Sequence, residues 1–151
     1  MSDVVPEICS CSALRQAARH VTKLYDDALA PLELGLNQYS ILAKLRRVGP
    51  KPLQDLAAFL VMDRSTLGHL LRPLEKRGLV TLDVSEEDRR SRVIALTPAG
   101  TALMKKAHPL WAKAERRFDG VFGADAALGL RTVLKQVATA DFSVERRPMQ
   151  P

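Results

Sequence analysis

The sequence predicts a mainly α-helical fold with one small β-hairpin, an α+β class. Apolar residues recur at helical spacing along most of the 151 residues, whereas residues 79–96 form two short β-like runs around a charged loop. Hydrophobic residues make up 46% of the chain, which is enough for a packed core in one domain of this length. The composition therefore indicates a folded protein.

Three helices are predicted before and at the start of the central region. Ser10–Ala30 and Leu36–Val48 each carry apolar residues at helical spacing. Gly49 and Pro50 break the chain, and the short apolar stripe of Pro52–Leu60 then predicts a third, shorter helix with proline at its first position.

The fold is organised around the next helix, Asp63–Gly78. Asp63 is a favourable N-cap and Gly78 a favourable C-terminal stop. The outward side chains are small, hydroxylated or hydrogen-bond donating, which suits contact with base edges and phosphates. The leucines predicted to face the core are Leu67, Leu70, Leu71 and Leu74. The outward residues, predicted to bind DNA, are Arg64, Ser65, Thr66, Gly68, His69 and Arg72, with Ser65, Thr66 and His69 as candidates for base edges.

A β-hairpin is predicted directly after this helix. Leu79–Val84 and Arg92–Leu96 are typical of strands, and the loop between them contains Arg89 and Arg90. A short helix, a turn, a second helix and a basic hairpin are the order of a winged helix-turn-helix. In that fold the second helix enters the major groove and the wing follows the backbone or the minor groove. Arg89, Arg90 and Arg92 are therefore predicted DNA contacts.

Two more helices follow the hairpin. Thr97 caps the first, Pro98 lies in its first turn, and its apolar stripe continues to Phe118. The second spans Ala124–Ala140. Together with the first helix of the chain, these make three helices, which is more than a helix-turn-helix lobe needs to bury its own core. We therefore predict that they are dimerisation arms.

The predicted organisation is one domain with a DNA-binding lobe on two helical arms. The lobe is assigned to residues 36–97, and the dimerisation helices to 11–34 and 98–141. Residues 1–8 and 142–151 are expected to be a loose arm and a tail.

The hairpin region resembles the DNA-binding lobe of MarR-type (multiple antibiotic resistance) regulators. The resemblance rests on Asp88-x-Arg90, on Leu96-Thr97 after five intervening residues, and on Gly100. The order and length of the flanking helices extend it over residues 11–141. It implies a homodimeric DNA-binding transcriptional regulator, usually a repressor that a small molecule or an oxidant releases. It also implies that Arg89 reaches the minor groove from the wing tip, while Arg90 pairs with Asp88 to brace the wing.

Charge and composition are consistent with that partner. Lysine and arginine number 23 against 17 acidic residues, a net charge of +6 that favours a polyanion such as double-stranded DNA. No apolar run approaches the about 20 residues needed to cross a bilayer, and residues 1–10 lack the features of a signal peptide. We expect a cytoplasmic protein without membrane contact.

The sequence carries no pattern typical of an enzyme. It has no glycine-rich phosphate loop, no cluster of histidine, cysteine and acidic residues at metal-ligand spacing, and no nucleophile elbow. We therefore predict no catalytic residue, no cofactor and no metal.

The sequence leaves three alternatives for the signal. The resemblance implies a cleft for an aromatic or phenolic acid, with Arg15, Arg19, His20 and Tyr39 as candidate lining residues. The second alternative is an oxidant sensed by cysteine. The third is a DNA-binding scaffold or activator module with no effector of its own. Trp111, on an arm helix, is expected to be buried there.

The oxidant alternative rests on Cys9 and Cys11. A helix N-terminus stabilises the thiolate, the form of cysteine that oxidants attack. Cys11 is similar in placement to the reactive cysteine of the organic-hydroperoxide branch of the MarR family, and Tyr25 resembles one of that branch's sulfur-binding tyrosines. Arg15 and Leu36 occupy other tyrosine positions of that branch, so the match is incomplete.

Overall fold

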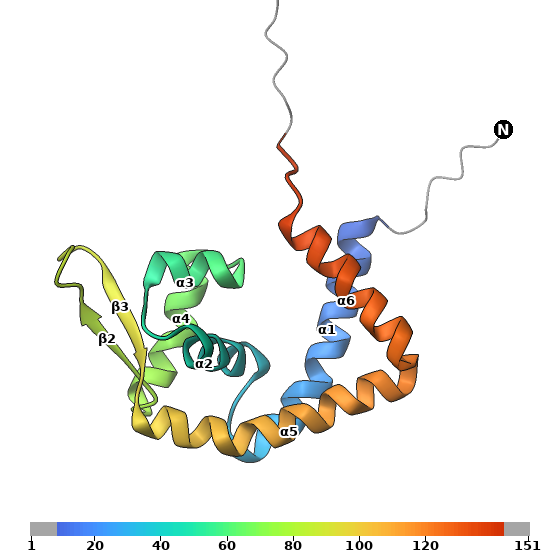
Figure 1. The fold of residues 1–151 in the computed structure, drawn as a ribbon, viewed down its shortest axis with the longest axis horizontal. Coiled ribbons are helices and arrows are strands. Elements are labelled where there is room, and N and C mark those ends of the chain that lie inside the picture. The colour runs from blue at the N-terminus through green and yellow to red at the C-terminus, as the bar shows by residue number, and fades with distance from the viewer. Residues whose placement is uncertain (1–8, 144–151) are drawn as a thin grey trace, which may run out of the picture. The chain divides into compact units, whose positions relative to one another are not determined.

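The computed structural model describes residues 9–143, so the expected N-terminal arm and the end of the expected tail lie outside the described residues. The chain divides into two compact units, one up to residue 115 and one from residue 116, and Figure 1 shows its helices and strands. The elements in chain order are α1 Ser10–Leu29, the 3₁₀-helix η1 Ala30–Leu32, α2 Leu36–Val48, β1 Lys51–Pro52, α3 Leu53–Leu60, α4 Arg64–Lys76, β2 Val80–Val84, β3 Arg92–Leu96, α5 Pro98–Phe122 and α6 Ala124–Thr139.

The first unit contains a small antiparallel sheet in the order β1-β3-β2. The predicted hairpin is confirmed, with Val80 opposite Leu96 and Val84 opposite Arg92. The short strand β1 was not predicted, because it has only two residues and one of them is Pro52. An edge strand tolerates proline because the missing N–H costs no ladder hydrogen bond on its outer side.

The core of the first unit lies between α2, the helix-turn-helix pair α3 and α4, and the sheet (Figure 1). Each helix presents one apolar stripe to the interior of the unit, and the large side chains of these stripes are fully buried there. The inward face predicted for α4 is confirmed, with Leu70 only half-buried. The fully buried core includes Ile41, Leu42, Leu45, Leu56, Leu67, Leu71, Leu74 and Ile94.

The C-terminal end of α4 forms a tight junction with the start of α5. Gly78 takes a positive φ of 68°, and the amide of Leu79 donates to the carbonyl of Leu74 at 3.0 Å, which ends the helix in a Schellman motif. The hydroxyl of Thr97 donates to the carbonyl of Gly78 at 2.6 Å and accepts from the amide of Gly100 at 3.0 Å. Thr97 is thus the N-cap of α5, as predicted, and also connects α5 to α4.

The second unit contains the last turns of α5, from Arg116 onward, and the whole of α6. Within it, Arg131 pairs with Asp119 and lies 5.9 Å from the centre of the Phe118 ring. Several large apolar side chains of α6 stay exposed, with Leu128 62% and Val133 54% accessible. In residues 9–143, no helix combines the length and the apolar character that crossing a membrane requires.

Gly100 is predicted to be the position in the first unit least able to accept a side chain. An alanine Cβ there would lie 2.2 Å from the carbonyl oxygen of Leu79 and 2.7 Å from Cδ1 of Leu96. Since backbone must move to relieve that clash, we expect Gly100→Ala to lower the free energy of unfolding by about 3 kcal/mol in urea titrations.

The control is Gly68→Ala, because Gly68 is also helical but has open space around its missing Cβ. This variant should gain about 0.5–1 kcal/mol from the better helix propensity of alanine. Equal stabilities for the two variants would contradict the proposed packing of α5 on the end of α4.

Candidate functional site

The first turn of α4 is held by its N-cap. The carboxylate of Asp63 accepts hydrogen bonds from the amide of Thr66 at 2.8 Å and from its hydroxyl at 2.6 Å. The hydroxyl of Thr66, and after it the Thr66 amide, hold the pKa of Asp63 below its ordinary value. Because the Thr66 hydroxyl donates its proton to Asp63, the side chain can offer a DNA base only a hydrogen-bond acceptor and a methyl group. The sequence did not reveal this restriction.

The remaining predicted residues of α4 share one outward face. Because they lie on the side opposite the buried leucines, they follow the helical spacing that the sequence predicts. Gly68 is half-buried, and the others, Arg64, Ser65, His69 and Arg72, are exposed. Among the described residues, no other element covers this face, so a binding partner can reach it.

The wing loop, residues 85–91, is braced by its own backbone. The hydroxyl of Ser85 accepts from the amides of Glu87 and Asp88, both at 3.2 Å. Asp88 accepts from the amide of Arg90 at 3.0 Å. The side-chain ion pair expected between Asp88 and Arg90 does not occur among the described residues. Asp88 instead shapes the turn as an Asx-type acceptor, and the guanidinium of Arg90 is left available.

The structure brings three predicted DNA contacts together from two elements. Arg64 of α4 and Arg90 and Arg92 of the wing line a hollow of about 200 Å³, together with Leu53, Gln54, Asp88 and Ser91. Arg64 is held toward it by a 3.4 Å hydrogen bond to the side chain of Gln54 on α3. Three guanidinium groups against one carboxylate favour an anion such as a phosphate. Arg89 is exposed on the loop and does not line this hollow.

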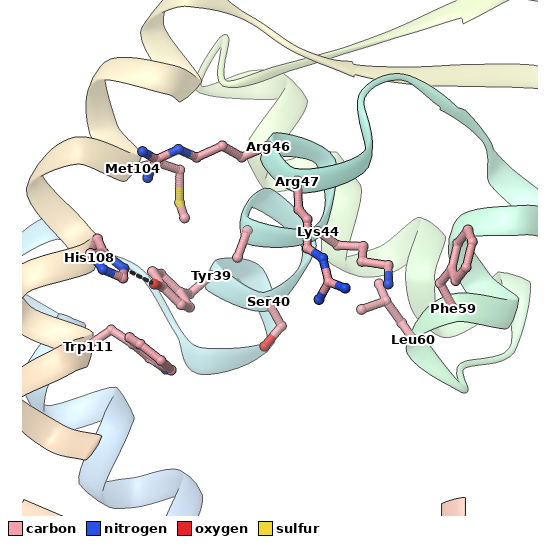
Figure 2. Close-up of a pocket in the computed structure, with 11 residues that line it drawn as sticks. Tyr39, Ser40, Lys44, Arg46, Arg47, Phe59, Leu60, Met104, His108 and Trp111 are labelled. Carbon is pink, nitrogen blue, oxygen red and sulfur yellow. Dashed lines mark hydrogen bonds between the residues drawn. The ribbon is translucent and has the colours of Figure 1, made fainter. Parts of the chain in front are cut away.

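A second, larger pocket of about 720 Å³ opens between α2, α3 and α5 (Figure 2). One side is aromatic. The ring of Trp111 stacks on Tyr39 with centroids 5.8 Å apart and on His108 at 5.5 Å, and the hydroxyl of Tyr39 lies 3.3 Å from Nδ1 of His108. Burial raises the pKa of Tyr39, against the lowering effect of Arg46, so the phenol stays neutral.

Three cations of α2 also line this pocket. Arg46 lies beside Met104 of α5, whereas Lys44 and Arg47 point toward the α3 side, and no carboxylate lines the pocket (Figure 2). The ammonium of Lys44 lies 4.3 Å from the ring centre of Phe59 on α3, and that ring is 52% exposed. Aromatic surface beside cations that have no carboxylate partner in residues 9–143 suits a ligand with a ring and a negative charge.

Only one of the four predicted ligand residues lines this pocket. Tyr39 lies at its aromatic side and is 5% exposed. Arg15, Arg19 and His20 lie on the exposed surface of α1 and are not part of it. Trp111 is half-buried, and its ring faces the pocket rather than being enclosed as expected.

Most of the pocket was missed from the sequence. Met104, His108 and Trp111 stand at i, i+4 and i+7 on α5, which places them on one helix face, and this is the signal that could have found them. Arg46 and Arg47 gave no such signal, because basic residues in the last turn of a helix are also expected from its dipole.

The cysteines lie at the exposed N-terminus of α1. Cys9 is the N-cap, with its sulfur accepting from the amide of Ser12 at 3.3 Å, and Cys11 follows in the first turn. Tyr25 is about four turns away, roughly 20 Å along the helix. Its hydroxyl donates to Glu115 at 2.8 Å. Within one chain, therefore, Tyr25 does not reach either sulfur.

Comparison with known proteins decides the family. Residues 34–91 match the model of the MarR family. The M. tuberculosis transcriptional regulator MOSR, solved in complex with DNA, is 30% identical, and the match covers 87% of this chain and 94% of that one with a TM-score of 0.79. The chain belongs to the MarR family. It is a winged-helix transcriptional regulator that binds DNA, as the resemblance implied.

Two other similar proteins are also transcriptional regulators. The organic hydroperoxide resistance transcriptional regulator of Bacillus subtilis (strain 168) is 35% identical over 97 residues, 64% of this chain and 66% of that protein, so the match spans just under two thirds of the relative. The transcriptional repressor CouR, bound to a 23-mer DNA duplex, is 30% identical with a TM-score of 0.78 over 86% of this chain and 92% of that one. CouR is also solved with p-coumaroyl-CoA.

The N-cap of α4 should make the stability of this MarR-family protein depend on pH. Because the pKa of Asp63 is lowered in the fold, its carboxylate stabilises the fold above the unfolded-state pKa of about 3.9. That contribution is lost as the pH falls through the lower folded-state value. Asp63→Asn removes this charge, so it should melt below the wild type at pH 7, and the gap should narrow as the pH falls below the unfolded-state value.

Thermal unfolding followed by circular dichroism between pH 2 and pH 7 measures this gap. Asp83→Asn, which makes the same charge change on the exposed strand β2, is the control. A gap between wild type and Asp63→Asn that is as large at pH 2.5 as at pH 7 would show that the cap is not the cause.

Proposed function

We propose that the protein is a homodimeric repressor that reads a pseudo-palindromic operator with the outward face of α4 and with the wing. The observation that carries this proposal is the convergence of Arg64, Arg90 and Arg92 beside the exposed first turns of α4. Phosphate contacts by the arginines position the helix, and Ser65 and His69 then lie where base edges are read. Two such lobes, about 34 Å apart, match successive major grooves.

Exposed apolar surface supports a second copy as partner. The first half of α1 is exposed, with Leu14 37% accessible, and α6 exposes an apolar stripe. A single chain leaves these faces in water, which costs hydrophobic stabilisation that a symmetric dimer recovers. We accordingly assign residues 11–34 and 98–141 to dimerisation and 36–97 to DNA binding.

The wing tip should contribute to the affinity for DNA and not to the stability of the fold or of the assembly. We expect Arg89→Ala to weaken binding to the DNA upstream of the protein's own gene by about tenfold and to lower the slope of log affinity against log salt by about 1. Fluorescence anisotropy at several salt concentrations measures both, and sedimentation should show an unchanged assembly. Lys105→Ala is the control, because it removes the same charge from an exposed side chain of α5 that has no hydrogen bond or ion pair among the described residues. An Arg89→Ala affinity equal to that control would remove the wing tip from the mechanism.

We further propose that an anionic aromatic ligand in the pocket of α2, α3 and α5 relieves repression. The stack of Tyr39, His108 and Trp111 offers a surface for a ring, and Lys44, Arg46 and Arg47 offer charges for a carboxylate or a phosphate. The p-coumaroyl-CoA held by CouR is a ligand of this chemical kind. The pocket is lined by α5 and by α3 of the helix-turn-helix. A ligand that contacts both helices therefore favours one position of α3 relative to α5 over another.

Trp111 allows a direct test, since it is the one tryptophan in the sequence. Titration with 4-hydroxybenzoate, 6-hydroxynicotinate or p-coumaroyl-CoA should change its fluorescence and weaken operator binding. Arg47→Ala should lower the ligand affinity by about tenfold or more, because it removes a charge that faces the pocket. Arg15→Ala, which removes an arginine outside the pocket, should bind as the wild type does. If Arg15→Ala loses the ligand and Arg47→Ala keeps it, the effector site is on α1 instead.

A second candidate signal is an oxidant, because both thiols are exposed at a helix N-terminus. If Cys11 is the sensor, mild organic peroxide should abolish operator binding by the wild type but not by Cys11→Ser. Cys9→Ser should stay sensitive. Equal binding by all three before and after peroxide would exclude this candidate. A protein that responds to neither ligand nor peroxide would be the effector-independent scaffold or activator.

A further inference from the structure

The far end of α4 is fastened to the corner between α1 and α2. Arg77, the C-cap of α4, donates from Nη1 to the carbonyl of Glu33 at 2.7 Å and from Nη2 to the carbonyl of Leu32 at 3.0 Å. These carbonyls lie more than forty positions away in sequence, at the end of η1. A planar guanidinium that spans two neighbouring carbonyls fixes direction as well as distance.

The corner that Arg77 grips is itself well fixed to α1. The carboxylate of Asp26 on α1 accepts from the amide of Leu36, the first residue of α2, at 2.7 Å. Glu33 takes a left-handed φ of 53°, and its amide donates to the carbonyl of Ala30 at 2.9 Å. One hydrogen bond within η1 and another from α1 to the start of α2 thus fix this corner to α1.

The opposite end of α4 carries the reading face. Helix α4 has 13 residues, so it is about 20 Å long. Gly78 at the same far end is also held by Thr97 of α5. Two of the helices assigned to dimerisation, α1 through its corner and α5 directly, are thus attached at one end of α4, while the residues proposed to contact DNA begin at the other.

We propose that Arg77 is a positioning residue that couples α1 to the recognition helix, so that a change in the dimer arm is passed to the reading end of α4. This inference rests on the proposed function, because it requires two lobes that read two half-sites. It predicts that Arg77 controls how strictly the spacing of the half-sites is read, without touching the DNA itself.

A charge effect at the end of α4 is the competing explanation. A cation there favours the helix dipole and attracts phosphate whatever it touches. Lys76 is the matched control, because it lies in the last turn of the same helix, is exposed, and has no hydrogen bond or ion pair among the described residues. Lys76→Met and Arg77→Met remove the same charge, but only the second removes the hydrogen bonds to the corner.

The experiment compares binding to the natural operator and to operators with two base pairs inserted or deleted between the half-sites. The wild type and Lys76→Met should both lose about tenfold or more on the altered spacings. Arg77→Met should bind the natural operator more weakly than Lys76→Met and should lose less than about threefold when the spacing changes. Arg77→Lys keeps the charge and one donor, so it should fall between them.

The outcomes separate the two proposals. If the wild type binds neither the natural operator nor its variants, the proposed function fails. If the wild type binds and discriminates spacing, but Arg77→Met behaves as Lys76→Met does, the coupling fails while the proposed function stands. If circular dichroism shows that Arg77→Met is unfolded, Arg77→Lys decides, and wild-type spacing discrimination by that variant overturns the inference.

Discussion

The close approach of Gly100 to the carbonyl of Leu79 is the constraint on which the arrangement of the DNA-binding lobe depends. A Cβ at that glycine would stand 2.2 Å from the carbonyl oxygen, so only glycine lets α5 begin against the end of α4. Thr97 then caps α5 and bonds to Gly78 in the same turn. One small residue and one hydroxyl therefore set where the recognition helix ends and where the next arm starts.

The division of α4 into two faces and two ends follows from this anchoring. Its leucines fill the core with α2 and the sheet, and the opposite, exposed face carries hydrogen-bond donors and small side chains. Gly78 and Arg77 fix the C-terminal end of this helix, and the exposed first turn is the part that we propose enters a groove. Asp63 then stiffens that turn by binding Thr66 twice.

Periodicity and punctuation residues made most of the fold predictable. Leucine spacing, an N-cap aspartate and glycine stops are local signals, so α2, α4 and the hairpin appear where the sequence places them. The pocket was not predictable in the same way, because Tyr39, Phe59 and Trp111 come from three separate helices and meet only through packing. Local pattern also did not show that the Asp88 brace uses the backbone of Arg90. Resemblance placed Tyr25 near a sulfur, but the helix keeps them about four turns apart.

The central claim is that two copies read two half-sites with α4 in the major groove and the wing beside it. Methylation protection on the DNA upstream of the protein's own gene tests it most directly. Dimethyl sulfate probes N7 of guanine in the major groove and N3 of adenine in the minor groove. The account predicts two symmetric clusters of protected guanines about 10 base pairs apart, flanked by protected adenines where the wings lie. A single cluster, or protection confined to minor-groove adenines, would contradict it.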